Sequence, residues 1–259
     1  MKLFVCSDLH SFFTPFKKAL DEVGFIHNYS EHLLVVCGDI WDRGSESYEA
    51  YEFLNSLNNV VLIRGNHEDL LEEMLARGYG EKHDHANGTT WTVCQIADAI
   101  GVRAKSTYEV CKAVEDFIKP FLNKFVNYFE TKQFVFTHSW IPCKVHFDGE
   151  GESKPWYTRN KTYEYMSDWR EANEVEWEEA RWGNPFKMAE AGLNQTGLTL
   201  VHGHWHNSWP RANYEGKPEF GEGADFSPYY GNNCIGLDAC TAHTNKCNIL
   251  ILEDELLEN

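Results

Sequence analysis

Short apolar runs alternate with amphipathic stretches along the first third of the chain. The runs at residues 3–6, 33–37 and 60–63 have the length and composition of buried strands. The segments 12–23 and 47–57 carry apolar residues at helical spacing. The pattern therefore predicts a β-α-β-α-β arrangement, which is typical of a sheet covered by helices.

The rest of the chain completes this picture. Thr14 is expected as the N-cap of the first helix, with Pro15 in its first turn. Residues 68–127 have helical periodicity with few breakers. Further strands are expected at residues 133–137, 198–201, 235–237 and 248–252.

One segment departs from the alternation. Residues 143–185 combine glycines, prolines, many acids and four tryptophans, so we expect an insertion of loops and short helices over the sheet edge and the active site. Residues 253–259 are expected to form a solvated acidic tail. We therefore predict one domain over residues 1–259 that carries this insertion.

Five predicted strands end in residues that can bind a metal ion. The sets are Asp8 and His10; Asp39 and Asp42, which Arg43 follows; Asn66 and His67; His138; and His204 and His206. In such sheets the polar residues beyond the strand ends gather at one edge, where ligands bind. Carboxylate, imidazole and amide oxygen together suit Mn, Fe or Zn, whereas a calcium site lacks imidazole and a structural zinc site usually uses cysteine. Gly38 and Gly65 precede two of these clusters and allow the backbone to approach a ligand closely.

Charge narrows the range of partners. The 259 residues include 40 acidic and 23 basic side chains, a formal net charge of −17. So acidic a surface repels phosphate backbones, which argues against stable nucleic-acid binding. No run approaches the roughly 18 apolar residues of a membrane span. The eight cysteines contain no Cys-x-x-Cys pair, and we expect free thiols in a reduced, cytoplasmic protein.

Taken in order, the polar blocks resemble those of the calcineurin-like metallophosphoesterases. The matching blocks are Asp8-Leu9-His10, residues 38–44 (GDIWDRG), residues 65–68 (GNHE), the lone His138 and residues 203–206 (GHWH). The blocks at 38–44 and 64–68 are most similar to the serine/threonine phosphoprotein phosphatases, including small bacterial and phage members. The resemblance implies an α/β fold, a four-layer α/β/β/α sandwich with the metal site at the strand ends.

The resemblance also implies two divalent metal ions per chain, of Mn, Fe or Zn. Asp8, His10 and His206 would hold the first ion, and Asn66, His138 and His204 the second, with Asp39 bridging both. The phosphoprotein phosphatases usually lack the second histidine of the last block, so His206 is a departure from that branch. His202, just before the block, is not expected to be a ligand.

The remaining roles concern the phosphate. By the same resemblance, Arg43 would bind the phosphate with Asn66 and His67, His67 would protonate the leaving group, and Asp42 would orient His67. Arginine is permanently charged, and a histidine beside a carboxylate stays cationic at neutral pH. The nucleophile would be a hydroxide bridging the two ions, since metal coordination lowers the pKa of water. Arg181, beside Trp182, is a weaker candidate for a second phosphate-binding arginine, with a plain surface residue as the alternative.

Three functions remain open. The first is a serine/threonine protein phosphatase that acts on a phosphoprotein or a small phosphoester. The second is a nucleotide hydrolase of the diadenosine-tetraphosphatase type or a phosphodiesterase, which His206 favours. The third is a non-catalytic scaffold of the same fold, which should have lost ligands that this chain retains. The tryptophans of the insertion, with Trp205 and Trp209, either line a substrate cleft or pack a lid onto the sheet.

Overall fold

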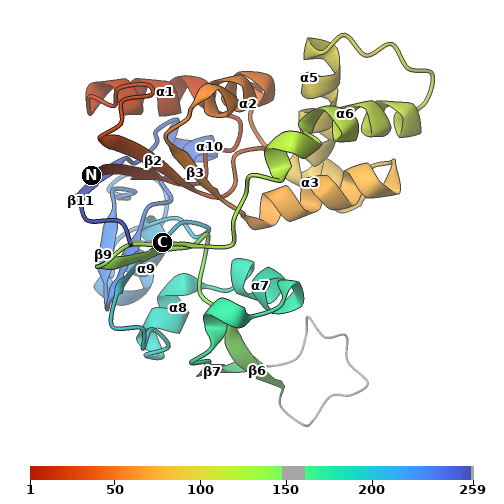
Figure 1. Ribbon diagram of the computed structural model, residues 1–259. Coiled ribbons are helices and arrows are strands. Elements are labelled where there is room, and N and C mark those ends of the chain that lie inside the picture. The colour runs from red at the N-terminus through yellow and green to blue at the C-terminus, as the bar shows by residue number, and fades with distance from the viewer. Residues whose placement is uncertain (148–160, 258–259) are drawn as a thin grey trace.

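The computed structural model describes residues 1–147 and 161–257. Its first sheet has the strand order β11-β1-β2-β3 (Figure 1). Strands β1 (Lys2–Cys6), β2 (His32–Cys37) and β3 (Val60–Ile63) run parallel, and β11 (Leu250–Glu253) pairs antiparallel with β1. Strands β1 and β2 are buried almost throughout, which explains why they read as continuous apolar runs. The predicted strands at the start of the chain are confirmed.

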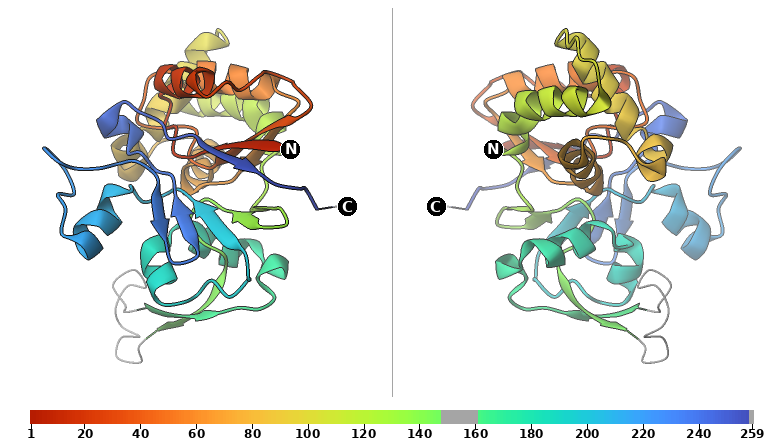
Figure 2. Two further views of the ribbon diagram at one scale, coloured as in Figure 1. Left: turned by 90° about the vertical axis from the view of Figure 1, so that its left-hand side faces the viewer. Right: turned by 90° about the vertical axis from the view of Figure 1, so that its right-hand side faces the viewer.

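Helices cover the outer face of this sheet (Figures 1 and 2). They are α1 (Phe13–Glu22), α2 (Ser47–Ser56), α3 (Asn66–Arg77), α4 (Lys82–Asn87), α5 (Thr89–Ala99) and α6 (Thr107–Leu122). Alternate strand residues such as Phe4, Leu34 and Val36 point into this helical layer and form a core with it. The helical periodicity of residues 68–127 is therefore confirmed as α3 to α6.

The start of α1 differs from the prediction. Phe12, not Thr14, is the N-cap, and Pro15 lies in the first turn as expected. The Thr14 hydroxyl donates to the Glu46 carboxylate, which also accepts the Thr14 backbone N–H at 2.9 Å. The Glu46 carboxylate, rather than the Thr14 hydroxyl, therefore satisfies a backbone N–H in the first turn of α1.

A second sheet packs face to face on the first. Its order is β4-β5-β8-β10-β9, and its three central strands β5, β8 and β10 are parallel. The bounds are β4 (Phe129–Glu130), β5 (Phe134–Phe136), β8 (Thr199–His202), β9 (Tyr229–Gly231) and β10 (Cys234–Gly236). The side chains between the two sheets form a second core, to which Val5, Val35, Phe136 and Val201 contribute.

The outer face of the second sheet is covered by the C-terminal half of the chain. The covering elements include the hairpin of β6 (Cys143–Phe147) and β7 (Lys161–Tyr165), the 3₁₀ turn Trp169–Glu171, α7 (Glu174–Arg181) and α8 (Pro185–Glu190). Trp169 and Trp177 are buried in the core that these elements share with the sheet. Helix, sheet, sheet and helix layers give the four-layer α/β/β/α sandwich that the resemblance implies. Helices α9 (Ser208–Glu215) and α10 (Thr241–Thr244) follow β8 and β10.

Two sequence expectations need correction. The segment 143–185 contains a β-hairpin as well as short helices, which its irregular composition did not indicate; residues 148–160, with Trp156, lie outside the described residues. The C-terminal segment is not simply a solvated tail. Glu253 belongs to β11, and buried Asp254 accepts hydrogen bonds from the backbone and side chain of Gln133, at 2.9 and 3.0 Å. In the described ranges, no helix is long and apolar enough to cross a membrane.

Candidate metal and phosphate site

The parallel strands of both sheets end at a common edge, and the sequence-predicted ligands follow them. Asp8 follows β1, Asp39 follows β2, Asn66 begins α3 after β3, His138 follows β5 and His204 follows β8. Several of these turns have left-handed backbone at non-glycine residues: Asp8, His10, Asp39, Asp42, Arg43 and His204, with φ between 47° and 74°. Strained backbone of this kind is held in place by its surroundings and concentrates at functional sites.

Asp39 lies at the centre of the site. Its Oδ2 is 3.7 Å from His10 Nε2, and its Oδ1 is 3.4 Å from His138 Nε2. Burial alone would raise the pKa of this carboxyl, but the surrounding imidazoles, His138 first, hold the pKa well below its usual range. The carboxylate therefore stays ionised and faces a group of nitrogen ligands on each side, as a bridging ligand must.

His138, Asn66 and His204 form the group on one side of Asp39. His138 Nδ1 lies 2.9 Å from the Cys37 carbonyl, which can only accept, so Nδ1 carries the proton and Nε2 presents a lone pair. That lone pair lies 2.8 Å from Asn66 Oδ1 and 3.1 Å from His204 Nδ1. Burial lowers the pKa of His138 and takes that of His204 down to about 3, which keeps both rings neutral. Neutral imidazoles and an amide oxygen converging on one point are a donor set that fits a divalent cation.

His10 and Asp8 form the group on the other side. His10 Nδ1 is 3.0 Å from the Trp41 carbonyl, so Nδ1 carries the proton and Nε2 again presents the lone pair, 3.9 Å from Asp8 Oδ1. Asp8 is buried and accepts the His204 backbone N–H at 3.0 Å. Burial, followed by repulsion from Asp238 and Asp39, raises the pKa of Asp8 well above its usual range. A cation between these groups would offset that repulsion.

The His206 side chain contacts residues outside these two groups. Its Nδ1 is 2.9 Å from Ser208 Oγ, its Nε2 is 3.4 Å from Glu219 Oε1, and its ring packs on Phe220. Among the described residues, the two Asp/His groups that could hold an ion are His10–Asp39–His67 and Asp39–His138–His204. The assignment of His206 to the first ion therefore remains a prediction.

Asp238 is a site residue that the sequence reasoning missed. It directly follows the region of β10, is buried, and lies close enough to Asp8 to raise its pKa. Burial raises the pKa of Asp238 itself to about 6. The signal was available, because Asp238 follows a predicted strand in the same way as Asp8 and Asp39 do.

His67, Asp42 and Arg43 lie beside the metal-type groups. His67 Nδ1 is 2.7 Å from Asp42 Oδ2, while its Nε2 is 3.2 Å from Arg43 Nη2. Arg43 Nη1 also donates to His10 Nε2 at 2.8 Å. Burial opposes a charge on His67, but Asp39 and the hydrogen bond to Asp42 outweigh it and raise the pKa of the imidazole. The environment thus favours the protonated form that a general acid requires.

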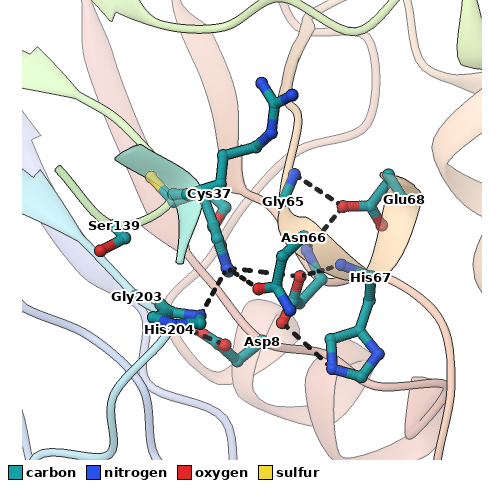
Figure 3. A network of polar contacts seen from close by, with 12 residues as sticks. Asp8, Cys37, Gly65, Asn66, His67, Glu68, Ser139, Gly203 and His204 are labelled. Atoms are coloured by element: carbon teal, nitrogen blue, oxygen red, sulfur yellow. Dashed lines mark hydrogen bonds and ion pairs between the residues drawn. The ribbon is translucent and has the colours of Figure 1, made fainter. Parts of the chain in front are cut away.

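Glu68 was noted only as part of a motif, and the structure shows what it does (Figure 3). Its Oε2 accepts the backbone N–H groups of Asp39 and Gly65 at 2.9 and 2.8 Å, and its Oε1 accepts that of Ile40 at 2.9 Å. One carboxylate therefore ties the loop after β2 to the loop after β3. A Cβ on Gly65 would collide with the Asp39 side chain, which explains the glycine at this crossing.

Arg181 is held by carboxylates. It is 3% exposed, and its Nε donates to Asp69 Oδ2 at 2.6 Å. Its remaining nitrogens contact Glu174 and Asn127. This network connects α7 to α3. The surface-residue alternative is wrong, because Arg181 is a buried ion-pair residue; a role in phosphate binding stays a prediction.

Residues 1–208 match the family model of the calcineurin-like phosphoesterases. The chain belongs to this family. Among the described residues, the strand-end Asp and His side chains are the groups that could hold a metal ion.

Individual relatives are similar over different extents. A symmetrical bis(5'-nucleosyl)-tetraphosphatase from Marinomonas sp. (strain MWYL1) is 34% identical over 82 residues, which make up 31% of this chain and only 29% of that protein. A cold-active protein tyrosine phosphatase has a TM-score of 0.56 at 16% identity, covering 97% of this chain and 73% of that one. A protein serine/threonine phosphatase from Saccharomyces cerevisiae has a TM-score of 0.53 at 14% identity, covering 100% and 81%. At these identities the two structures show a shared fold.

Proposed function

We propose that this protein hydrolyses phosphate monoesters with two divalent ions at the strand ends, and that its substrates are phosphoserine and phosphothreonine residues of proteins. The observation that carries the proposal is the His67–Asp42 pair with Arg43, next to Asp39, which both Asp/His groups share; His67 itself belongs to the first of these groups. Asp8, His10 and His206 would hold one ion, and Asn66, His138 and His204 the other. Bound there, the ions would supply Lewis acidity to the phosphoryl group and activate a water molecule.

The side chains of the chain itself account for the remaining steps. Arg43 reaches the site from a fixed loop, and its fork of N–H donors suits two nonbridging phosphate oxygens. Asn66 Oδ1 lies 2.8 Å from His138 Nε2, so its amide oxygen would hold the metal with His138 while its amide nitrogen would be a donor to the phosphate. Asp42 holds the Nδ1–H of His67 and would stabilise the charged ring. A proton on Nε2 would then serve the leaving oxygen once the Arg43 guanidinium, 3.2 Å from that nitrogen, turns to the phosphate. His67 lies beside Arg43, so the proton donor stands next to the group proposed to bind the phosphate.

A second candidate function has its own support. The local identity with the symmetrical tetraphosphatase favours a dinucleoside polyphosphate as substrate. Trp182, half-exposed, stands edge-on to His204 at 6.1 Å, and Trp205 packs against Trp209 nearby. An aromatic side chain at the site can stack on a base as well as pack on a peptide, so these tryptophans do not separate the two substrates.

Substrate assays separate them. Purified protein supplied with Mn²⁺ should be tested on p-nitrophenyl phosphate, a phosphoserine peptide, bis-p-nitrophenyl phosphate and diadenosine tetraphosphate. We expect the monoesters to be hydrolysed with the highest kcat/KM. Exclusive turnover of the dinucleotide would refute the protein-phosphatase proposal, and exclusive turnover of the diester would identify a phosphodiesterase.

The His67→Ala variant tests the mechanism. We expect turnover to fall by about 10²–10⁴-fold with metal content retained, the usual contribution of general acid catalysis. His83→Ala, which removes a half-exposed histidine from α4, is the matched control and should leave turnover unchanged. Unchanged turnover in His67→Ala would exclude His67 as the acid.

The compartment is also a proposal. Five of the cysteines are buried as unpaired side chains, including Cys6 and Cys37 in the strands that support the site. Such thiols act as small apolar core residues and suit a reducing cytoplasm.

A further inference from the structure

Helix α5 contacts the loop between β2 and α2, which carries Asp42 and Arg43, through two buried threonines. Thr89 Oγ1 donates to Asp42 Oδ2 at 2.7 Å, and Thr92 Oγ1 donates to Asp42 Oδ1 at 2.9 Å. All three side chains are inaccessible to solvent. The carboxylate that holds His67 is therefore itself held from the far side, with a hydroxyl on each of its oxygens.

The same helix also holds the backbone of this loop. Thr92 Oγ1 accepts the Asp42 backbone N–H at 3.1 Å. Three residues further along, Gln95 Nε2 donates to the Gly44 carbonyl at 3.0 Å, and Gln95 Oε1 accepts the Ser47 N–H at 3.1 Å. Residues three apart share one face of a helix, so this face of α5 runs along the loop that carries Asp42 and Arg43.

The junction before α5 fits the same arrangement. Gly88 has φ +94°, and a Cβ built on it would lie 2.5 Å from the Arg43 backbone nitrogen. Only a glycine lets the α4–α5 turn approach Arg43 so closely. Asp42 and Arg43 both have left-handed backbone, which is stable only when neighbouring segments hold it in place. The turn at Gly88 and the start of α5 are such neighbouring segments.

We propose that Thr89 and Thr92 are positioning residues for the reaction: they fix the rotamer of Asp42 and, through it, the orientation of the His67 ring toward the leaving group. Asp42 Oδ2 accepts from both His67 and Thr89, so the direction of one bond constrains the other. This inference rests on the proposed role of His67 as general acid.

The test uses variants that remove the hydroxyl but keep the shape. Thr89→Val, Thr92→Val and the double variant are compared with Thr89→Ser and Thr92→Ser, which retain a donor. Thr131→Val is the control, because Thr131 is equally buried but its hydroxyl bonds within the β4–β5 turn, far from Asp42 in the chain. Metal content is measured for each protein.

The readout is the dependence of kcat on the leaving group. Phenol, with a pKa near that of tyrosine, needs a proton as it leaves, whereas p-nitrophenol is a far better leaving group. We expect each valine variant to lower kcat for phenyl phosphate by roughly 10–100-fold, the effect of a small misplacement of a catalytic group. The loss on p-nitrophenyl phosphate should be under about threefold. KM and metal content should change little, and the serine variants should restore most of kcat.

The possible results separate a positioning role of the two threonines from a purely structural one. Equal losses on both substrates, losses that follow metal content, or serine variants as poor as valine variants would show a structural role only and overturn the inference. Full activity of the valine variants beside an inactive His67→Ala would overturn it while the proposed function stands. If His67→Ala is itself fully active, the proposed function has failed instead. Should the double valine variant not fold, the single variants carry the comparison.

Discussion

Replacing Arg181 tests whether this buried arginine stabilises the fold or binds phosphate. The Arg181 side chain is 4% exposed, and its guanidinium forms ion pairs with Asp69 and Glu174. Arg181→Met keeps much of the side-chain volume and removes the charge. We expect a less stable protein with an unchanged active site.

The size of the expected loss in the free energy of unfolding depends on the ion-pair partners of Arg181. Removing one member of a buried ion pair costs about 3–5 kcal/mol when the other charge is left unpaired. Asp69 is 12% exposed, but Arg64 Nε also contacts it at 2.5 Å and would remain. Glu174 is 64% exposed, so its lost pair contributes at most about 1 kcal/mol. The expected loss in the free energy of unfolding is therefore about 2–3 kcal/mol, below the full cost of an orphaned buried charge.

Urea unfolding of metal-loaded protein would measure this loss, with kcat/KM for p-nitrophenyl phosphate measured in parallel. The double variant Arg181→Met with Asp69→Asn should lose less than the sum of the single losses, because the two side chains are coupled. Unchanged stability together with a tenfold or larger rise in KM would refute the reasoning and return Arg181 to the phosphate site.

Two further predictions concern other parts of the molecule. Gly38→Ala should lower metal content and destabilise the fold by more than the roughly 1–2 kcal/mol of left-handed strain, because the new Cβ would lie 2.5 Å from His138 Nδ1; a variant with normal metal content and unfolding midpoint would contradict the close approach seen here. Cys94 is exposed on α5 while the other seven cysteines are buried or half-buried, so one thiol per chain should react quickly with Ellman's reagent; a fast thiol that persists in Cys94→Ser would show that another cysteine is accessible.

Much of the site could be predicted from the sequence because strand ends are a local signal. An apolar run fixes where a buried strand stops, and the residue beyond it lies at the sheet edge. Asp39 and Asn66 were found in this way, and applying the rule to the strand before Asp238 would have found that residue too. His206 lies further from its strand, and its assignment to the first ion stays a prediction. It lies four residues beyond the end of β8, and the turn that begins there directs its ring to Glu219.

The parts that could not be predicted depend on contacts between distant segments. Thr89 and Thr92 lie 47 and 50 residues from Asp42, and in the sequence they are two ordinary polar residues of an amphipathic helix. Arg181 meets Asp69 across 112 residues. Helical periodicity predicts that α5 exists and that it has a buried face, but it does not state what that face covers. Only the packing of α5 on the loop after β2 shows that the Thr89 and Thr92 hydroxyls contact Asp42 and are not simply part of the hydrophobic core.

The buried carboxylates of the site differ in how the surrounding chain satisfies them. The chain carries a formal net charge of −17, yet the carboxylates of Asp8, Asp39, Asp42 and Asp238 are buried close to one spot. Buried carboxylates are costly unless cations or N–H and O–H donors satisfy them. Asp42 is satisfied by His67 and the α5 threonines, whereas Asp8 and Asp238 have raised pKa values from burial. The site therefore contains carboxylates of two kinds: one held by the chain's own donors, and others whose repulsion bound cations would relieve. This division of the acids would suit an acidic protein to the proposed anionic substrate, because two bound ions together with Arg43 would reverse the sign of the field where the phosphate enters.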